Sequence, residues 1–143
     1  NDSGTKVSVD LGCPGNYSPV TYTYQYYSNC PQGTKTQWTY MSYDTLTPGN
    51  SNVVFKARTA DSIPLLANAS YATLATARAM PNTQVCPMAG PAPCPIDLYA
   101  AFGLVDARRS YLELSMTLNP SIDRSGGARV NGWELMYSCP PSE

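Results

Sequence analysis

The sequence predicts a mainly β protein: an antiparallel β-sandwich with one or two short helices, held by disulfide bonds. Three observations lead to this fold class. Apolar and polar residues alternate with a period of two along several segments, which is typical of half-buried strands. Turn residues, such as the Pro-Gly of "TPGN" (47–50), separate those segments. Five cysteines occur in a chain of 143 residues, the size of one ordinary domain.

The clearest strand is "VTYTYQYY" (20–27), which places Val and Tyr residues on one face and mainly Thr and Gln residues on the other. Five further segments alternate in a similar way between turn residues. Because β-branched and aromatic residues favour half-buried strands, we expect a strand in each segment. These segments are 5–11, 35–43, 52–59, 110–118 and 129–138.

One stretch departs from this pattern. "DSIPLLANASYATLATARA" (61–79) is rich in Ala and Leu, and Asp61 or Ser62 can cap a helix that has Pro64 in its first turn. The Asn, Ser and Thr residues that follow weaken a helix, so we expect a short one. A second helical turn is expected over 97–103, beginning at its Asp and ending at its Gly.

Two regions are expected along the chain. Residues 1–34 are Tyr-rich and predict N-terminal strands or an arm, whereas residues 35–143 predict the sandwich module. The segment "TKVSVDL" (5–11) of the arm can add a strand to the open sheet edge of a neighbouring copy, which is one way to build a filament.

Several motifs of residues 35–139 follow one another in a recognisable order: "VVFKARTADS", "CPIDL", "YLELSMTLNPS" and "VNGWELMYSC". This order resembles that of the jelly-roll or galactose-binding-like β-sandwich modules of bacterial secreted and cell-surface proteins. The resemblance implies a jelly-roll-like sandwich outside the cell. It implies no single function, because such modules vary widely in role.

The cysteines indicate disulfide bonds rather than a metal or redox centre. The chain has no CxxC pair and no histidine, so the usual ligands of zinc and iron–sulfur sites are missing. Cys86 and Cys94 enclose the loop "CPMAGPAPC" and form the best-supported pair, because three prolines already restrict that loop.

The other three cysteines leave the pairing open. Cys139 is expected to bond to Cys30 or to Cys13, unless those two bond to each other. One thiol is then left over, either buried or bonded to another chain, and Cys13 is the candidate. Disulfides persist in oxidising surroundings, so the predicted localisation is extracellular or at the cell surface.

Charge and hydropathy exclude two classes of partner. Nine Lys plus Arg against ten Asp plus Glu give a net charge of −1, without a basic run. A nucleic-acid groove needs clustered cations, so we expect no nucleic-acid partner. The longest apolar runs, such as "LYAAFGLV" (98–105), are too short for a membrane span.

The sequence favours a protein that is not an enzyme. Without histidine, the commonest base beside a nucleophile is missing. Glu113 and Glu134 lie on the last two predicted strands, where they can face one another as a glycosidase pair does. Each is opposite in phase to its strand's apolar face, so both are expected to be solvent-exposed. Arg58, Arg108 and Arg109 are expected to be solvated or paired with nearby Asp residues.

No cofactor is predicted, although modules of the resembled type often hold a structural Ca²⁺. The loop "NPSIDRSGG" offers Asn119 and Asp123 among its alternating polar residues. A single carboxylate carries too little charge for firm Ca²⁺ binding, so a polar hairpin turn is the preferred interpretation.

The aromatic residues are the strongest indication of a binding surface. Tyr22, Tyr24 and Tyr26 share one face of a predicted strand, with Trp38 and Tyr40 nearby in the sequence. Such residues most commonly fill a sandwich core. A subunit interface is the second interpretation, and a platform that stacks on sugar rings is the third.

We therefore expect a non-catalytic structural or assembly module of an extracellular or cell-surface bacterial protein, such as a subunit of a filament or appendage. Its partners are then further copies of itself or other surface proteins. The alternative is a carbohydrate-binding module of a secreted enzyme or adhesin, which predicts a polysaccharide as partner.

Overall fold

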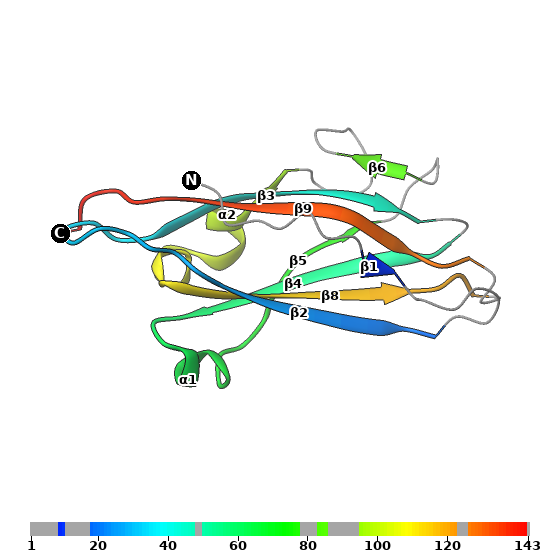
Figure 1. The fold of residues 1–143 in the computed structure, drawn as a ribbon, viewed down its shortest axis with the longest axis horizontal. Coiled ribbons are helices and arrows are strands. Elements are labelled where there is room, and N and C mark those ends of the chain that lie inside the picture. The colour runs from blue at the N-terminus through cyan, green and yellow to red at the C-terminus, as the bar shows by residue number, and fades with distance from the viewer. Residues whose placement is uncertain are drawn as a thin grey trace.

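The chain folds into two antiparallel sheets packed face to face (Figure 1). The computed structural model describes residues 9–10, 18–47, 50–77, 83–85, 95–122 and 126–142. One sheet has the order β1-β9-β3-β6, with β7 also paired to β3, and the other has the order β2-β8-β4-β5. The expected β-sandwich is therefore confirmed. Its strands are β1 (Val9–Asp10), β2 (Val20–Tyr27), β3 (Gln37–Leu46), β4 (Asn52–Ala60), β5 (Ala72–Ala77), β6 (Thr83–Val85), β7 (Ile96–Asp97), β8 (Tyr111–Asn119) and β9 (Arg129–Ser138).

The path of the chain between the sheets is that of a jelly roll. From β1 to β4, each successive strand lies in the opposite sheet; β4 and β5 are then neighbours in one sheet. The chain returns to the first sheet for β6 and β7 and crosses again for β8 and for β9. Wrapping of this kind is how a double-sheet jelly roll closes around one core.

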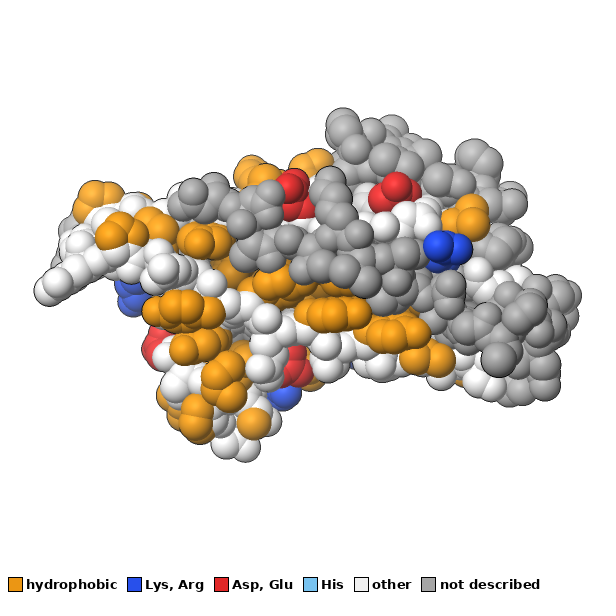
Figure 2. All heavy atoms as spheres, viewed as in Figure 1, with side chains coloured by type: hydrophobic (Ala, Val, Ile, Leu, Met, Phe, Trp, Pro, Cys, Tyr) orange, Lys and Arg blue, Asp and Glu red, His pale blue; other side chains and the backbone are white. Residues whose placement is uncertain are grey.

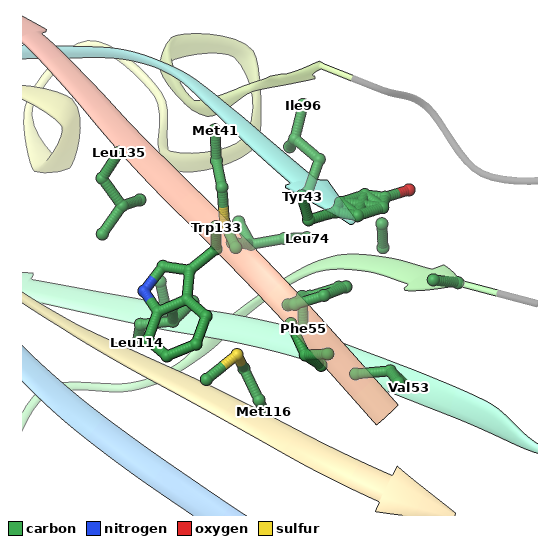
Figure 3. Close-up of a cluster of buried hydrophobic side chains, with 14 of the residues drawn as sticks. Met41, Tyr43, Val53, Phe55, Leu74, Ile96, Leu114, Met116, Trp133 and Leu135 are labelled. Atoms are coloured by element: carbon green, nitrogen blue, oxygen red, sulfur yellow. The ribbon is translucent and has the colours of Figure 1, made fainter. Parts of the chain in front are cut away.

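The core lies between the inner faces of the two sheets, around Trp133 of β9. Figure 3 shows the Trp133 indole beside Leu114 and Met116, which point inward from β8. Phe55 of β4 meets Tyr43 of β3, with ring centroids 4.7 Å apart. These side chains are almost completely excluded from solvent. Burial of each large apolar side chain stabilises the fold by about 1.5–3 kcal/mol, so this layer holds the sheets together.

The first helix, α1 (Ile63–Leu66), projects from the outer side of the β2-β8-β4-β5 sheet (Figure 1). Ser62 caps it by accepting the Leu65 N–H at 3.3 Å, and a proline lies in its first turn. The expected short helix and its cap are confirmed. The later Ala- and Thr-rich part is strand β5, which the sequence did not indicate. Pairing with β4 overrides the weak helical preference of these residues.

The second helix, α2 (Leu98–Phe102), begins and ends where expected. Asp97 caps it through Oδ1, which accepts the Ala100 N–H at 3.0 Å. Gly103 ends it with φ of 89°, a value that favours glycine. A turn of 3-10 helix, η1 (Asp106–Arg108), follows, and Thr59 Oγ1 donates a hydrogen bond to the Asp106 carbonyl at 2.7 Å.

A disulfide joins Cys30, just after β2, to Cys139, just after β9, with the two Cα atoms 5.6 Å apart. The flanking segments are also hydrogen bonded. Lys35 N–H donates to the Pro140 carbonyl at 2.9 Å, and Ser142 N–H donates to the carbonyl of residue 33 at 3.0 Å. One of the pairings that the sequence left open is thereby confirmed. The cysteines at positions 13, 86 and 94 lie outside the described residues.

The described part of residues 1–34 belongs to the sandwich. β2 pairs with β8 along its whole length, and Val9 and Asp10 of the 5–11 segment pair with β9 of the same chain. The structure therefore places this two-residue strand on an edge within its own chain. An assembly role for the first 34 residues remains a prediction.

Loss of the Cys30–Cys139 bond is expected to destabilise the protein by roughly 2–5 kcal/mol, because the bond closes a loop spanning most of the chain. Replacing both cysteines by serine should lower the urea midpoint accordingly. The single variant Cys139→Ser should show a similar loss, since a bond removed at one end is lost entirely. An unchanged midpoint in either variant contradicts a stabilising role.

Candidate functional site

The outer face of the β2-β8-β4-β5 sheet carries a buried polar cluster centred on Glu113 of β8, which is 7% exposed. Its carboxylate accepts three hydrogen bonds. Gln25 of β2 donates to Oε1 at 3.1 Å, while Arg58 of β4 and the Tyr71 hydroxyl donate to Oε2 at 3.1 and 2.5 Å. Three strands and the segment before β5 therefore meet at one carboxylate.

Arg58 connects this cluster to the segment between α1 and β5. Its Nη1 donates to the carbonyls of Ala67 and Ala69 at 3.3 and 3.2 Å. Its guanidinium also lies over the Tyr71 ring, 4.5 Å from the centroid, as in a cation–π contact. The cluster thus holds the α1–β5 segment against the sheet.

The cluster fixes the ionisation of two of its members. Burial disfavours the Glu113 carboxylate, but hydrogen bonds from Tyr71 and Gln25 and the charge of Arg58 outweigh that cost, so the pKa of Glu113 lies below its ordinary value. Burial and the hydrogen bond to Glu113 raise the pKa of Tyr71 to about 12. At neutral pH the carboxylate is ionised and fully engaged by donors, which suits a structural role better than proton transfer.

Three sequence expectations are corrected by this arrangement. Glu113 is buried, not solvent-exposed, because the α1–β5 segment covers it. Glu113 and Glu134 lie in different sheets and point to opposite outer faces, so they do not face one another. Arg58 pairs with Glu113 rather than with an Asp, whereas Arg109 pairs with Asp61 at 2.9 Å, as expected.

A cleft of about 490 Å³ opens between the α1–β5 segment and the α2–η1 segment. Phe102 and Leu65 supply apolar wall, and Figure 2 shows hydrophobic side chains on the projection that α1 forms. Arg109 lies at the cleft between two carboxylates, bonded to Asp61 at 2.9 Å and to Asp106 at 3.1 Å. These ion pairs engage Arg109 and both carboxylates of the cleft with one another, and the remaining charged residue of its wall, Arg58, is paired with Glu113.

The tyrosines on the inner face of β2 lie at the edge of one sheet, and their side chains pack against the core. Tyr22, Tyr24 and Tyr26 are half-buried against the core cluster. The Tyr24 ring lies 5.1 Å from that of Trp133, whose Nε1 donates to the Tyr26 hydroxyl at 2.7 Å. In Figure 2, hydrophobic side chains line the flank of the sandwich along which β2 runs in Figure 1.

The other predicted aromatic residues have different environments. Trp38 is completely buried, and its Nε1 donates to the Arg109 carbonyl at 2.8 Å, so it offers no face to a sugar. Tyr40 is exposed on β3. On the outer face of the other sheet, Tyr27 is 53% exposed and its ring centroid lies 4.8 Å from that of Tyr111.

The outer edge of β2 has no strand partner in the described structure. β2 pairs with β8 over eight residues without a register shift, and none of the described strands pairs with its other side. Residues 18–29 contain no Lys, Arg, Asp or Glu, and 20–27 contain no Pro. Charges, prolines and bulges are the usual devices that protect an edge strand from pairing with another chain. β2 has none of these devices.

The opposite edge of the same sheet differs. β5 has six residues, and its pairing with β4 contains a register shift between Phe55 and Lys56. A bulge of this kind twists an edge and disfavours the addition of a further strand. The two edges are therefore not equivalent.

The candidate calcium loop lies only partly within the described residues. Asp123 of the calcium candidate lies outside the described residues, and Asn119 donates its side-chain N–H to Asn52 Oδ1 at 2.9 Å. No group of three or more Cys, Asp or Glu residues that could hold a metal ion occurs in the described part of the chain. None of the described helices is long and apolar enough to cross a membrane.

Comparisons with protein families, with curated proteins and with solved structures find no match to this chain.

Glu113→Gln is expected to destabilise the protein by about 1–3 kcal/mol at neutral pH, because it removes a buried charge that accepts hydrogen bonds from three donors. Because the pKa of Glu113 is lower in the folded protein than in the unfolded chain, its ionised carboxylate stabilises the fold at pH values above the ordinary glutamate pKa. This contribution is lost as the pH falls through the pKa that Glu113 has in the folded protein. Urea unfolding of the parent chain and of Glu113→Gln should therefore show a difference in the free energy of unfolding that is largest at neutral pH and decreases below about pH 4.

The matched control is Glu134→Gln, which makes the same charge change at a half-buried residue on the outer side of β9. It should lower the free energy of unfolding by less than Glu113→Gln does. Equal effects of the two substitutions, or a difference that grows toward acidic pH, contradict the role assigned to the Glu113 cluster.

Proposed function

We propose that this chain is a non-catalytic structural and assembly module of an extracellular or cell-surface protein, and that it assembles through the edge of β2. The observation that carries the proposal is the eight-residue edge strand without charge, proline or bulge. Such an edge presents unpaired N–H and C=O groups, which favour the addition of a strand from another chain.

Two further observations support a structural role. The Cys30–Cys139 bond covalently closes one end of the sandwich and suits an oxidising location. Glu113, the most buried carboxylate of the described residues, is taken up by Gln25, Arg58 and Tyr71. The hydrogen bonds of Glu113 thus hold three strands and the α1–β5 segment together.

Thr23→Lys tests the assembly role. Thr23 is exposed at the middle of β2, where a lysine places a charge on the pairing edge. Sedimentation of the parent chain, with its disulfide intact, should show association that increases with protein concentration. The substitution should weaken that association by about tenfold or more, equivalent to ~1.4 kcal/mol.

Thr73→Lys is the matched control, since Thr73 is exposed on β5 at the other edge of the same sheet. This variant has the same added charge and should associate like the parent chain. A parent chain that remains monomeric, or association that survives Thr23→Lys unchanged, counts against assembly through β2.

A carbohydrate-binding module is the second candidate, favoured by one observation. Exposed Tyr27 and half-buried Tyr111 form a ring pair on the same outer sheet face as exposed Thr23 and Gln25. Aromatic rings stack on the apolar faces of sugars, and hydroxyl and amide groups bond to the hydroxyls of sugars.

Retention of the chain on insoluble polysaccharides tests this candidate. If it is correct, Tyr27→Ala should reduce retention, because the most exposed ring of the pair is lost. Tyr40→Ala, which removes an exposed ring from the other sheet, should leave retention unchanged. A chain that is not retained on any polysaccharide tested rules the candidate out for those polymers.

A further inference from the structure

We propose that the partner of the β2 edge is a second copy of this chain, which pairs through its own β2 in antiparallel orientation about a two-fold axis at Thr23. The inference rests on the proposed assembly function and specifies its partner. It joins two four-stranded sheets into one continuous sheet across the axis.

The sequence of β2 is complementary to itself in this arrangement. With Thr23 opposite Thr23 of the second copy, Tyr22 lies opposite Tyr24 and Thr21 lies opposite Gln25. Tyrosine therefore meets tyrosine on the core side, and polar side chains meet on the outer side. Cross-strand aromatic pairs and pairs of hydrogen-bonding side chains are the contacts that stabilise neighbouring strands.

Charge also permits two identical edges to meet. A strand that pairs with its own copy places like residues close together, so any Lys, Arg, Asp or Glu near the axis would face a like charge. The segment 18–29 has none, although the chain carries nineteen charged residues, nine basic and ten acidic. Absence of charge over the whole edge is the condition that self-pairing requires.

The half-buried tyrosines give the pairing an apolar component. Tyr22, Tyr24 and Tyr26 pack against the core on one side and remain partly exposed at the flank of the sandwich. A second β2 laid along this flank covers their exposed parts with the same residues. Tyrosine suits such a surface, because it combines apolar area with a hydroxyl that can remain hydrated.

The fold also selects the register. A shift that places Tyr24 on the axis would put Val20 opposite Ser28 of the second copy. Ser28 is 2% exposed, and its N–H and hydroxyl both bond to the Ser110 carbonyl, at 2.9 and 3.0 Å, so it is not accessible to a second strand. With Thr23 on the axis, residues 20–26 pair with one another within β2, and the residue that Tyr27 then meets, Pro19, is exposed.

A head-to-tail contact between β2 of one copy and β5 of the next would produce an open fibre rather than a closed pair. The register shift between Phe55 and Lys56 disfavours that contact, because a bulged edge pairs poorly. The regular β2 edge and the bulged β5 edge therefore both favour the closed pair through β2 over the open fibre.

The test is a cross-link at the axis in the full-length chain. Residues directly opposite in an antiparallel pair have Cα atoms roughly 4.5–5.5 Å apart, which is within reach of a disulfide. Under mild oxidation, Thr23→Cys should give mostly covalent dimer in a non-reducing gel. Mass spectrometry should find a peptide joined to its own copy through position 23.

Thr21→Cys is the register control. It lies on the same strand and face, but its neighbour across the axis is Gln25, so its dimer fraction should not exceed that of the parent chain. Absence of a cross-link in Thr23→Cys beyond the parent level, or equal cross-linking in both variants, overturns this pairing.

The result also separates the inference from the proposed function. If Thr23→Lys abolishes association while Thr23→Cys gives no cross-link, β2 is an assembly edge but its partner is not a second β2 in this register. If the parent chain remains monomeric at every concentration, both the self-pairing and the assembly role fail.

Discussion

The contact on which the flank of the sandwich depends is that between Trp133 and the tyrosines of β2. Trp133 lies in β9, in one sheet, yet its indole N–H bonds to the Tyr26 hydroxyl in the other sheet, and its ring lies against Tyr24. β2 is an edge strand and has a strand partner on one side only among the described residues. These inter-sheet contacts attach β2 to the core in addition to its ladder with β8. Trp133 therefore ties the edge to the core and helps to keep β2 in one regular register, which is the property that pairing with another strand requires.

The polar cluster has the same organising role on the outer face. Transfer of Glu113 and Arg58 out of water is costly, and a buried ion pair often adds little to stability over apolar residues of the same shape. Its effect here is one of geometry. The Arg58 guanidinium bonds both to Glu113 and to the carbonyls of Ala67 and Ala69, so it holds the α1–β5 segment against the sheet. That segment also forms one wall of the cleft, whose shape thus depends on a carboxylate in the middle of β8.

Alternation along each strand predicted which way most side chains point, and it predicted the bounds of β2 and β9. It did not predict what covers an outward-facing residue. Glu113 points outward as its phase requires, but the residue that covers it, Tyr71, is distant in sequence and lies in a segment that the local pattern assigned to a weakening helix. β5 was missed for a related reason, because short Ala and Thr side chains have no strong strand preference and the pairing partner decides their conformation. Cys30 and Cys139 were among several candidate pairs. Only the topology, which ends β2 and β9 at the same end of the sandwich, selects them.

The bond between Cys30 and Cys139 also determines how the module responds to mechanical load. A pulling force on the two ends of the polypeptide reaches Cys30 from one side and Cys139 from the other, and it passes through the sulfur–sulfur link. The intervening residues, which include β3, β4, β5 and β8, lie outside that path and need not extend. The tension falls on the chain before residue 30, where β2 is held by its ladder with β8 and by Trp133. The sandwich is thus built so that most of its length is shielded from tension, while β2 lies in the segment that carries the tension.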